Sequence, residues 1–334
     1  MDQDVPLTFN PRRLAVIDCG TNTFSMLIAD VKEGSWETVF TMRHPVYIGQ
    51  GGFKQGTLVP DRFAKGVDAL RVMQEATWNY GAKEVLVVAT SAVRDASNGD
   101  IFCQKVKEIT GWDVHVISGQ REAELVHAGV DLTLEAVPGV HLIMDIGGGS
   151  VEFIMATSSG LDDSKIIWSK SIDAGVARLE DFGKPEDPIG QDGVGRFGPF
   201  LEYTLAPLKE AIALHRPIQL IGSSGSFDTF YDLVTSGKGV ISEAHEESKH
   251  PKMVEIERLG LNAVHDDLIQ RNQESRLAMP GMAPARARMM PLSSMLLQSV
   301  LEMLPADLKV FRSSYALREG ILREVQAHGQ WKGK

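Results

Sequence analysis

Short apolar runs alternate with amphipathic stretches along most of this chain. Apolar runs bounded by polar residues or glycine predict buried β-strands over residues 84–90, 114–117, 165–172, 218–222 and 307–311. Apolar side chains at helical spacing predict helices over residues 98–110, 119–134, 200–215 and 315–327. The alternation of strands and helices predicts an α/β fold.

One segment of the chain is repeated. LAVIDCGTNTFSMLIA (residues 14–29) and LIMDIGGGSVEFIMA (residues 142–156) match when Asp18 is placed on Asp145. A glycine two positions later and a hydroxyl residue five positions later then coincide as well. Each copy is an apolar strand, a glycine-containing polar turn and a second apolar strand, which is typical of a β-hairpin. The repeat predicts a duplicated domain whose two hairpin turns face one cleft.

The repeat also suggests where the domains lie. We expect a first domain over residues 12–130 and a second over residues 131–312, with a C-terminal helix, residues 313–330, packing back on the first. Residues 183–199 are rich in glycine, proline and aspartate, which predicts a loop. Asn98 is expected to cap the helix that follows it.

Composition narrows the class of protein. A length of 334 residues with 43% hydrophobic residues suits about two globular domains. A formal net charge of −10 makes general nucleic-acid binding unexpected, so a polyanionic substrate would need a local site of its own. No apolar run approaches the roughly 18 residues of a membrane span. Two cysteines, Cys19 and Cys103, suit a reducing cytoplasm.

Two aspartates at strand ends are the first candidates for chemistry. Asp18 and Asp145 each precede a glycine turn, where a carboxylate can hold Mg²⁺ and backbone N–H groups can cradle phosphate. Glu152 lies close enough along the chain to share a metal with Asp145. An all-oxygen set favours Mg²⁺ or Mn²⁺ over zinc. The alternatives are aspartates that cap their own turns and a glutamate on a strand surface.

A wider set of motifs resembles a known family. VIDCGTNTFSMLI, ATSAVRDASN, VISGQREAELVHAGV, IMDIGGGSVEF, SIDAGVARL and IGSSGSFDTF occur in that order, followed by SRLAMPGMAPARARMMP and YALREGIL. Together they resemble the exopolyphosphatase/guanosine pentaphosphate phosphatase family, within the superfamily of sugar kinases, actin and heat-shock ATPases. The resemblance implies two actin-like, ribonuclease H-like α/β domains with an interdomain cleft.

The resemblance also implies roles for individual residues. It implies a catalytic role for Glu122, which would activate water, and metal binding by Asp18, Asp145 and Glu152. It implies phosphate binding by Asp18, Gly20, Thr21, Asn22, Thr23, Arg94, Gly147, Gly148, Gly149, Ser150, Gly222, Ser223, Ser224, Gly225 and Ser226.

Glu122 can also be considered without the resemblance. It lies in the first turn of the helix that starts near Ser118, where the helix dipole favours a carboxylate by about 0.3–1 kcal/mol. The dipole lowers the carboxyl pKa, so we expect an ionised Glu122 that orients water rather than a strong base. A glutamate that only stabilises the helix start is the alternative.

The resemblance implies a reaction and leaves alternatives open. The expected activity is release of terminal orthophosphate from inorganic polyphosphate by Mg²⁺-assisted, in-line attack of water, with guanosine pentaphosphate as the alternative substrate. An ATP-dependent kinase and a non-catalytic nucleotide or alarmone binder are the rivals from other classes. A homodimer is a family-level expectation, and no membrane or nucleic-acid partner is expected. Two departures from the family pattern, Ser25 and Arg288, leave a phosphate contact and a loop shape open.

Overall fold

The structure of the chain is a computed structural model. It describes all residues except 1–11, 135–136, 159–163, 237–251, 332 and 334, so the polar segment before Arg12 lies outside the described residues. Among the described helices, none has both the length and the apolar character that crossing a membrane requires.

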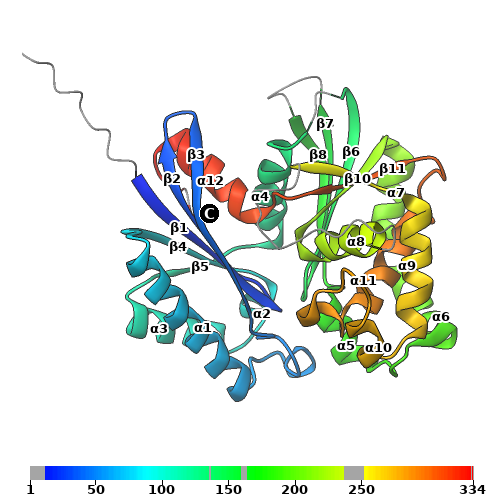
Figure 1. The fold of residues 1–334 in the computed structure, drawn as a ribbon, viewed down its shortest axis with the longest axis horizontal. Coiled ribbons are helices and arrows are strands. Elements are labelled where there is room, and N and C mark those ends of the chain that lie inside the picture. Colours follow the sequence, from blue (N-terminus) through cyan, green and yellow to red (C-terminus); the bar gives the residue numbers. More distant parts are fainter. Residues whose placement is uncertain (1–11, 135–136, 159–163, 237–251, 332, 334) are drawn as a thin grey trace, which may run out of the picture.

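Two β-sheets organise the molecule (Figure 1). The first has the strand order β3-β2-β1-β4-β5 and the second the order β10-β11-β9-β6-β7-β8. The first sheet comprises β1 (Arg12–Cys19), β2 (Thr23–Lys32), β3 (Ser35–Pro45), β4 (Glu84–Ala89) and β5 (Val114–Val116). The second comprises β6 (Gly139–Ile146), β7 (Val151–Ser158), β8 (Ser164–Ile172), β9 (Gln219–Ser223), β10 (Met253–Ile256) and β11 (Lys309–Ser313).

The two sheets share a topology. In each, an antiparallel hairpin (β1–β2 or β6–β7) is extended by a third antiparallel strand on one side and by a parallel strand on the other. The predicted α/β class and the predicted duplication are therefore confirmed.

Helices form three layers around the sheets. They are α1 (Pro60–Asn79), α2 (Ser91–Arg94), α3 (Gly99–Thr110), α4 (Gly119–Asp131), α5 (Val176–Gly183), α6 (Gly190–Thr204), α7 (Ala206–His215), α8 (Ser224–Ser236), α9 (Arg258–Gln270), α10 (Gln273–Leu277), α11 (Met290–Leu301) and α12 (Leu317–His328), with short 3₁₀ turns at Phe53–Gln55 and Pro284–Arg286. Helices α1 and α3 cover one face of the first sheet. Helices α4 and α12 lie between the sheets, and α5–α9 and α11 cover the far side of the second (Figure 1).

Strand alternation assigns side chains to these layers. In β1, Ala15 and Ile17 pack toward α1 and α3, whereas Leu14 and Val16 pack toward α4 and α12. In the second sheet, Ile143 joins the same middle layer. Successive strand residues face opposite sides of a sheet, so each central strand is buried on both faces.

The middle layer depends on a close helix crossing. A Cβ added to Gly129 of α4 would lie 1.9 Å from the carbonyl oxygen of Ala316, and one added to Gly320 of α12 would lie 1.9 Å from that of Leu125. Only glycine permits backbones to approach this closely. Since α4 packs on α12 and also on β8 of the second sheet, the division of the chain at residue 131 stays a prediction.

The predicted loop over residues 183–199 is wrong in its second half. Helix α6 begins at Gly190 and includes Pro199. Val194, Phe197 and Leu201 recur at helical spacing and pack into the core of the second sheet, so tertiary packing overrides the weak helix propensity of glycine. The predicted helix 200–215 is in turn divided at Leu205, where α6 ends and α7 follows.

Asn98 has a different role from the predicted cap. Its side chain does not cap α3. Instead, its amide accepts a hydrogen bond from the backbone nitrogen of Leu58 (2.8 Å) and donates one to the backbone oxygen of the same residue (2.9 Å). Asn98 therefore ties the segment that precedes α1 to the start of α3.

We predict that Gly320→Ala lowers the free energy of unfolding by about 1–3 kcal/mol, because the added methyl group forces α4 and α12 apart. The matched control is Gly195→Ala within α6, where an added Cβ meets nothing within 4 Å and should stabilise the helix by about 0.5–1 kcal/mol. Urea denaturation measures both. Equal effects of the two substitutions would contradict the close crossing.

Candidate active site

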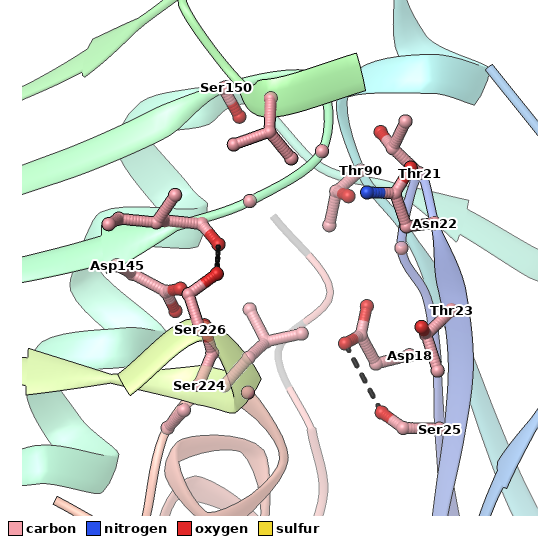
Figure 2. A pocket seen from close by; sticks show the side chains of 18 of the residues that line it. Asp18, Thr21, Asn22, Thr23, Ser25, Thr90, Asp145, Ser150, Ser224 and Ser226 are labelled. Atoms are coloured by element: carbon pink, nitrogen blue, oxygen red, sulfur yellow. Dashed lines mark hydrogen bonds between the residues drawn. The ribbon is translucent and has the colours of Figure 1, made fainter. Parts of the chain in front are cut away.

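The turns of the two hairpins meet at one cavity that is partly open to solvent. The cavity has a volume of about 160 Å³ and lies between the sheets, with side chains from both hairpins pointing into it (Figure 2). The structure brings fifteen of the predicted residues to its wall: Asp18, Gly20, Thr21, Asn22, Thr23, Glu122, Asp145, Gly147, Gly148, Gly149, Ser150, Glu152, Ser224, Gly225 and Ser226.

The two turns touch each other directly. A Cβ added to Gly148 would lie 2.8 Å from side-chain atoms of Thr21 and Asn22, and one added to Gly149 would lie 2.4 Å from Oγ of Ser91. Any larger residue would separate the turns. The glycines of the second turn are therefore required by the close approach of the first.

Helix α5 orients the second turn. Backbone N–H groups at its start, those of Gly175, Val176 and Ala177, donate to the carbonyl oxygens of Gly149, Gly147 and Gly148 at 2.8–3.2 Å. The carbonyl groups of the turn are thus held toward α5, and an anion in the cavity does not meet them.

Asp145 and Glu152 form an acidic pair across the second hairpin. They are direct partners in the β6–β7 register, and Ser171 donates a hydrogen bond to Glu152 at 2.7 Å. Burial, together with the charge of Asp145, raises the pKa of Glu152 to about 7. Burial also raises the pKa of Asp145, although a hydrogen bond from Ser224 opposes the shift.

Asp18 occupies the matching position in the first hairpin. Its strand partner is Ser25, the counterpart of Glu152, and the Ser25 hydroxyl lies 3.4 Å from the Asp18 carboxylate. Burial raises the pKa of Asp18 to about 7, with Arg318 opposing and Asp145 adding to the shift. The first hairpin therefore carries one carboxylate where the second carries two.

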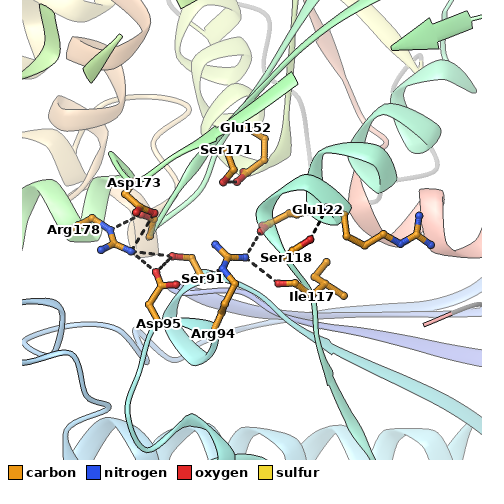
Figure 3. A network of polar contacts seen from close by, with 12 residues as sticks. Ser91, Arg94, Asp95, Ile117, Ser118, Glu122, Glu152, Ser171, Asp173 and Arg178 are labelled. Carbon is orange, nitrogen blue, oxygen red and sulfur yellow. Dashed lines mark hydrogen bonds and ion pairs between the residues drawn. The ribbon is translucent and has the colours of Figure 1, made fainter. Parts of the chain in front are cut away.

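Glu122 enters the cavity from the first turn of α4. The Ser118 hydroxyl caps this helix by accepting from the backbone nitrogen of Arg121 at 3.2 Å. Arg94 donates from Nη1 to Glu122 Oε2 (3.2 Å) and to the carbonyl oxygen of Ile117 (3.1 Å) (Figure 3). The arginine thereby fixes the position of the carboxylate.

The predicted pKa of Glu122 is wrong in direction. Burial and the nearby charge of Glu152 raise the pKa of Glu122 well above its usual range, although Arg94 opposes them. Desolvation of a buried carboxylate shifts a pKa by up to about 3–5 units, whereas the helix dipole contributes only about 0.3–1 kcal/mol.

Three predicted phosphate-binding residues do not line the cavity: Arg94, Gly222 and Ser223. Arg94 is engaged by Glu122. A Cβ on Gly222 would fall 1.9 Å from the ring of Phe227, so this glycine makes room for a core side chain.

The cavity wall also contains arginines that the sequence motifs did not single out. Arg43, Arg286 and Arg318 all line it. The guanidinium of Arg286 packs against Gly225 and forms no hydrogen bond or ion pair with another described residue. Burial and the neighbouring Arg43 lower its pKa to about 10. The only sequence signal for Arg286 is its place in the family-like segment PARAR.

The structure clarifies the two departures from the family pattern. Arg43 is the direct strand partner of Ser25 in the β2–β3 register, so a basic side chain reaches the cavity from the neighbouring strand. Asp228 holds this arginine with an ion pair of 3.1 Å. Arg288 points elsewhere, because its Nε lies 2.5 Å from the carboxylate of Glu180 on α5.

Three long helices begin at the cavity. Glu122 in the first turn of α4, residues 224–226 at the start of α8, and residues 316–319 at the start of α12 are all part of its wall. Each helix start carries partial positive charge and N–H groups that favour anions. The cavity is therefore suited to an anion although the chain is acidic overall.

The acidic residues of the wall fit a hard divalent cation. Asp18, Asp145 and Glu152 offer carboxylate oxygens, which Mg²⁺ and Mn²⁺ prefer. Among the described residues, however, no three acidic, histidine or cysteine side chains converge on one metal position. This arrangement suits Mg²⁺, which is usually held by one or two carboxylates while water and substrate phosphates complete its coordination.

Comparisons with known proteins agree with this geometry. A model of the Ppx/GppA phosphatase family matches residues 27–328. A guanosine-5'-triphosphate,3'-diphosphate pyrophosphatase of Vibrio vulnificus is 27% identical over 94% of this chain and 59% of its own length. An exopolyphosphatase 2 of Mycobacterium tuberculosis is 30% identical over 82% of this chain and 85% of its own length. The chain thus spans little more than half of the Vibrio relative.

Solved structures resemble the whole described fold. The structure of an exopolyphosphatase from Cytophaga hutchinsonii has a TM-score of 0.87 and 32% identity, covering 94% of this chain and 98% of that one. A Ppx/GppA family member from Aquifex aeolicus has a TM-score of 0.73 at 24% identity, covering 95% and 99%, which is a likeness of fold. The expected two-domain, actin-like arrangement is confirmed by these neighbours.

We predict that the stability of the metal-free protein falls as the pH rises from about 4.5 through 7. A group whose pKa is raised by folding binds its proton more tightly in the folded state, so ionisation of Glu152 destabilises the fold. Glu152→Gln should raise the free energy of unfolding at pH 8 by on the order of 2 kcal/mol and flatten the pH profile of stability.

Ser171→Ala removes a hydrogen bond to the ionised form of Glu152, so this variant should make the pH profile of stability steeper. Chemical denaturation in chelating buffer between pH 4 and pH 9 measures these slopes, and a stability that rises toward pH 8 would contradict the prediction.

Proposed function

This chain belongs to the Ppx/GppA phosphatase family, and we propose that it hydrolyses the terminal phosphoanhydride bond of inorganic polyphosphate and releases orthophosphate. The observation that carries the proposal is the meeting of both hairpin turns and Glu122 at one cavity. The turns can hold a phosphate group while a carboxylate adjoins it.

We infer that the terminal phosphate lies between the turns. Backbone N–H groups of residues 21–23 and 148–150 would donate to its oxygens, as glycine-rich turns do at anion sites. The starts of α8 and α12 add positive potential. Arg43 and Arg286 would contact the next phosphates of the polyphosphate, because both arginines line the cavity. Arg286 lies against Gly225 at the start of α8.

Glu122 would orient a water molecule for in-line attack on the terminal phosphorus. The water oxygen forms the new bond, the bridging P–O bond breaks, and its electron pair stays on the shortened polyphosphate. Burial raises the pKa of Glu122 above its usual range, which makes the carboxylate a stronger proton acceptor late in the step. Arg94 would keep the carboxylate in place. Positioning and charge stabilisation carry most of such a reaction.

We further propose that Asp145 and Glu152, with Asp18 opposite, hold Mg²⁺, with Mn²⁺ as the alternative. When bound, the cation would neutralise charge on the phosphate oxygens.

The comparisons favour polyphosphate over guanosine pentaphosphate. The relatives named exopolyphosphatase match this chain over 85% and 98% of their own length, against 59% for the Vibrio relative. Guanosine pentaphosphate remains the second candidate, because the Vibrio relative named for that class of substrate aligns over 94% of this chain.

The rivals from other classes have less support. A non-catalytic binder does not require a carboxylate buried beside the phosphate position, where Glu122 lies. A kinase is disfavoured by the match to a phosphatase family over residues 27–328. A homodimer and a cytoplasmic location remain predictions.

We predict that Glu122→Gln lowers kcat for phosphate release from polyphosphate by about 10²–10⁴-fold, because the amide cannot accept the proton of the attacking water. Asp145→Asn should raise the Mg²⁺ concentration needed for half-maximal activity. Glu108→Gln, on the surface of α3, is the matched control and should retain full turnover. Near wild-type turnover of both site variants on polyphosphate and on guanosine pentaphosphate would refute the assignment.

We predict that Arg286→Met raises KM for polyphosphate by about ten- to a hundredfold, with a smaller effect on kcat, because a charge-assisted hydrogen bond contributes about 1.5–3 kcal/mol. Arg288→Met, two residues away and turned toward Glu180, is the control. Steady-state kinetics on both variants would test the difference. Equal KM values would remove Arg286 from the phosphate path.

A further inference from the structure

Asp95, at the end of α2, lies outside the cavity wall but contacts the residues that organise it (Figure 3). Its carboxylate accepts a hydrogen bond from Ser91 Oγ at 3.0 Å and pairs with Nε of Arg94 at 3.4 Å. It also accepts a hydrogen bond from Nη2 of Arg178. One carboxylate therefore holds two arginines from different parts of the fold.

Arg178 connects Asp95 to the second phosphate turn. It comes from α5, on the side of the second sheet, and donates from Nε to the carbonyl oxygen of Gly149 at 2.9 Å. Its Nη2 also donates to Ser91 Oγ at 3.2 Å, and its guanidinium lies over the ring of Phe53 at 4.5 Å. These contacts clamp the glycine turn of the second hairpin against α2, which follows β4 of the first sheet.

Arg94 connects Asp95 to Glu122. One edge of its guanidinium faces Asp95, while Nη1 donates to Glu122 and to the carbonyl oxygen of Ile117. Asp95 thus shares the positive charge of Arg94 with Glu122. Among the described residues, removal of Asp95 would leave Glu122 as the only carboxylate paired with this arginine.

Among the described residues around Arg178, no other carboxylate makes an equal contact. Its other carboxylate contact, Asp173, lies at 3.5 Å, and the Asp173 side chain is 70% exposed, against 33% for Asp95. Exposed ion pairs of that kind contribute little. The loss of Asp95 would therefore release Arg178, and with it one constraint on Gly149.

We propose that Asp95 is a positioning residue for phosphoanhydride hydrolysis. Through Arg94 it sets the position of Glu122. Through Arg178 it holds the turn of the second hairpin against α2. The inference rests on the proposed function for its kinetic part. Asp95 need not touch the substrate to act in this way, since small misplacements of reacting groups can cost about a hundredfold in rate.

The central experiment compares Asp95→Asn with Asp173→Asn. Both remove one carboxylate that contacts Arg178, but only Asp95 also contacts Arg94. We expect Asp95→Asn to lower kcat by about ten- to a hundredfold and to raise KM severalfold, and Asp173→Asn to stay within about twofold of wild type. Asp95→Glu should restore part of the loss. Kinetics for Asp95→Asn that match those of Asp173→Asn would overturn the proposal.

A double-mutant comparison separates positioning from general loss of structure. Arg178→Lys keeps the charge but loses the forked contact with Gly149, Ser91 and Asp95. If Asp95 acts partly through Arg178, Asp95→Asn should raise KM less in the Arg178→Lys background than in wild type. Independent, multiplying effects on KM would count against the link. Arg178→Lys also keeps the proposal testable if Asp95→Asn does not fold.

Amide hydrogen exchange provides a readout that does not need activity. Residues 147–150 and the first turn of α5 should exchange faster in Asp95→Asn and in Arg178→Lys than in wild type, and Asp173→Asn should leave them unchanged. Unchanged exchange in both test variants would overturn the clamp. A wild-type protein that releases no phosphate from either substrate, but shows this exchange pattern, would refute the proposed function and leave the structural role of Asp95 standing.

Discussion

The close crossing of α4 and α12 is the constraint on which the rest of the structure depends. Gly129 and Gly320 let the two backbones touch, and the resulting pair fills the space between the sheets. Glu122 lies seven residues before Gly129 and Arg318 two residues before Gly320, so the crossing sets where both enter the cavity. A looser crossing would separate the sheets and, with them, the two hairpin turns.

An acidic protein can still contain a local anion site, because charges act at short range in salt. The net charge of −10 is spread over the whole chain, and salt screens charges beyond about 8–10 Å. At the cavity, an anion would meet the starts of α4, α8 and α12 and the arginines at 43, 286 and 318. The helix starts and these arginines place positive charge at the cavity, so the overall negative charge does not by itself exclude a specific anion site.

The sequence predicted those parts of the site that are local in the chain. The matched turns follow from a strand, a glycine turn and a second strand, so Asp18 and Asp145 could be placed on one cavity before the fold was seen. Arg43 could not, because its position depends on the register that sets it opposite Ser25. The raised pKa of Glu122 also escaped prediction, since burial by distant segments outweighs the local helix dipole. The first part of helix α6 was missed for the same reason, because its structure depends on packing of its apolar side chains into the core of the second sheet.

Burial of the carboxylates links the stability of this fold to its chemistry. Asp18, Glu122, Asp145 and Glu152 all have raised pKa values, because burial disfavours their ionised forms. A cation between the two hairpins would reverse that preference, because an opposite charge within a few ångströms favours the ionised form. A phosphate anion would need the same cation, since these carboxylates would otherwise repel it. If the proposed function is right, a cation and a phosphate would therefore bind best together, beside the Glu122 carboxylate that Arg94 holds.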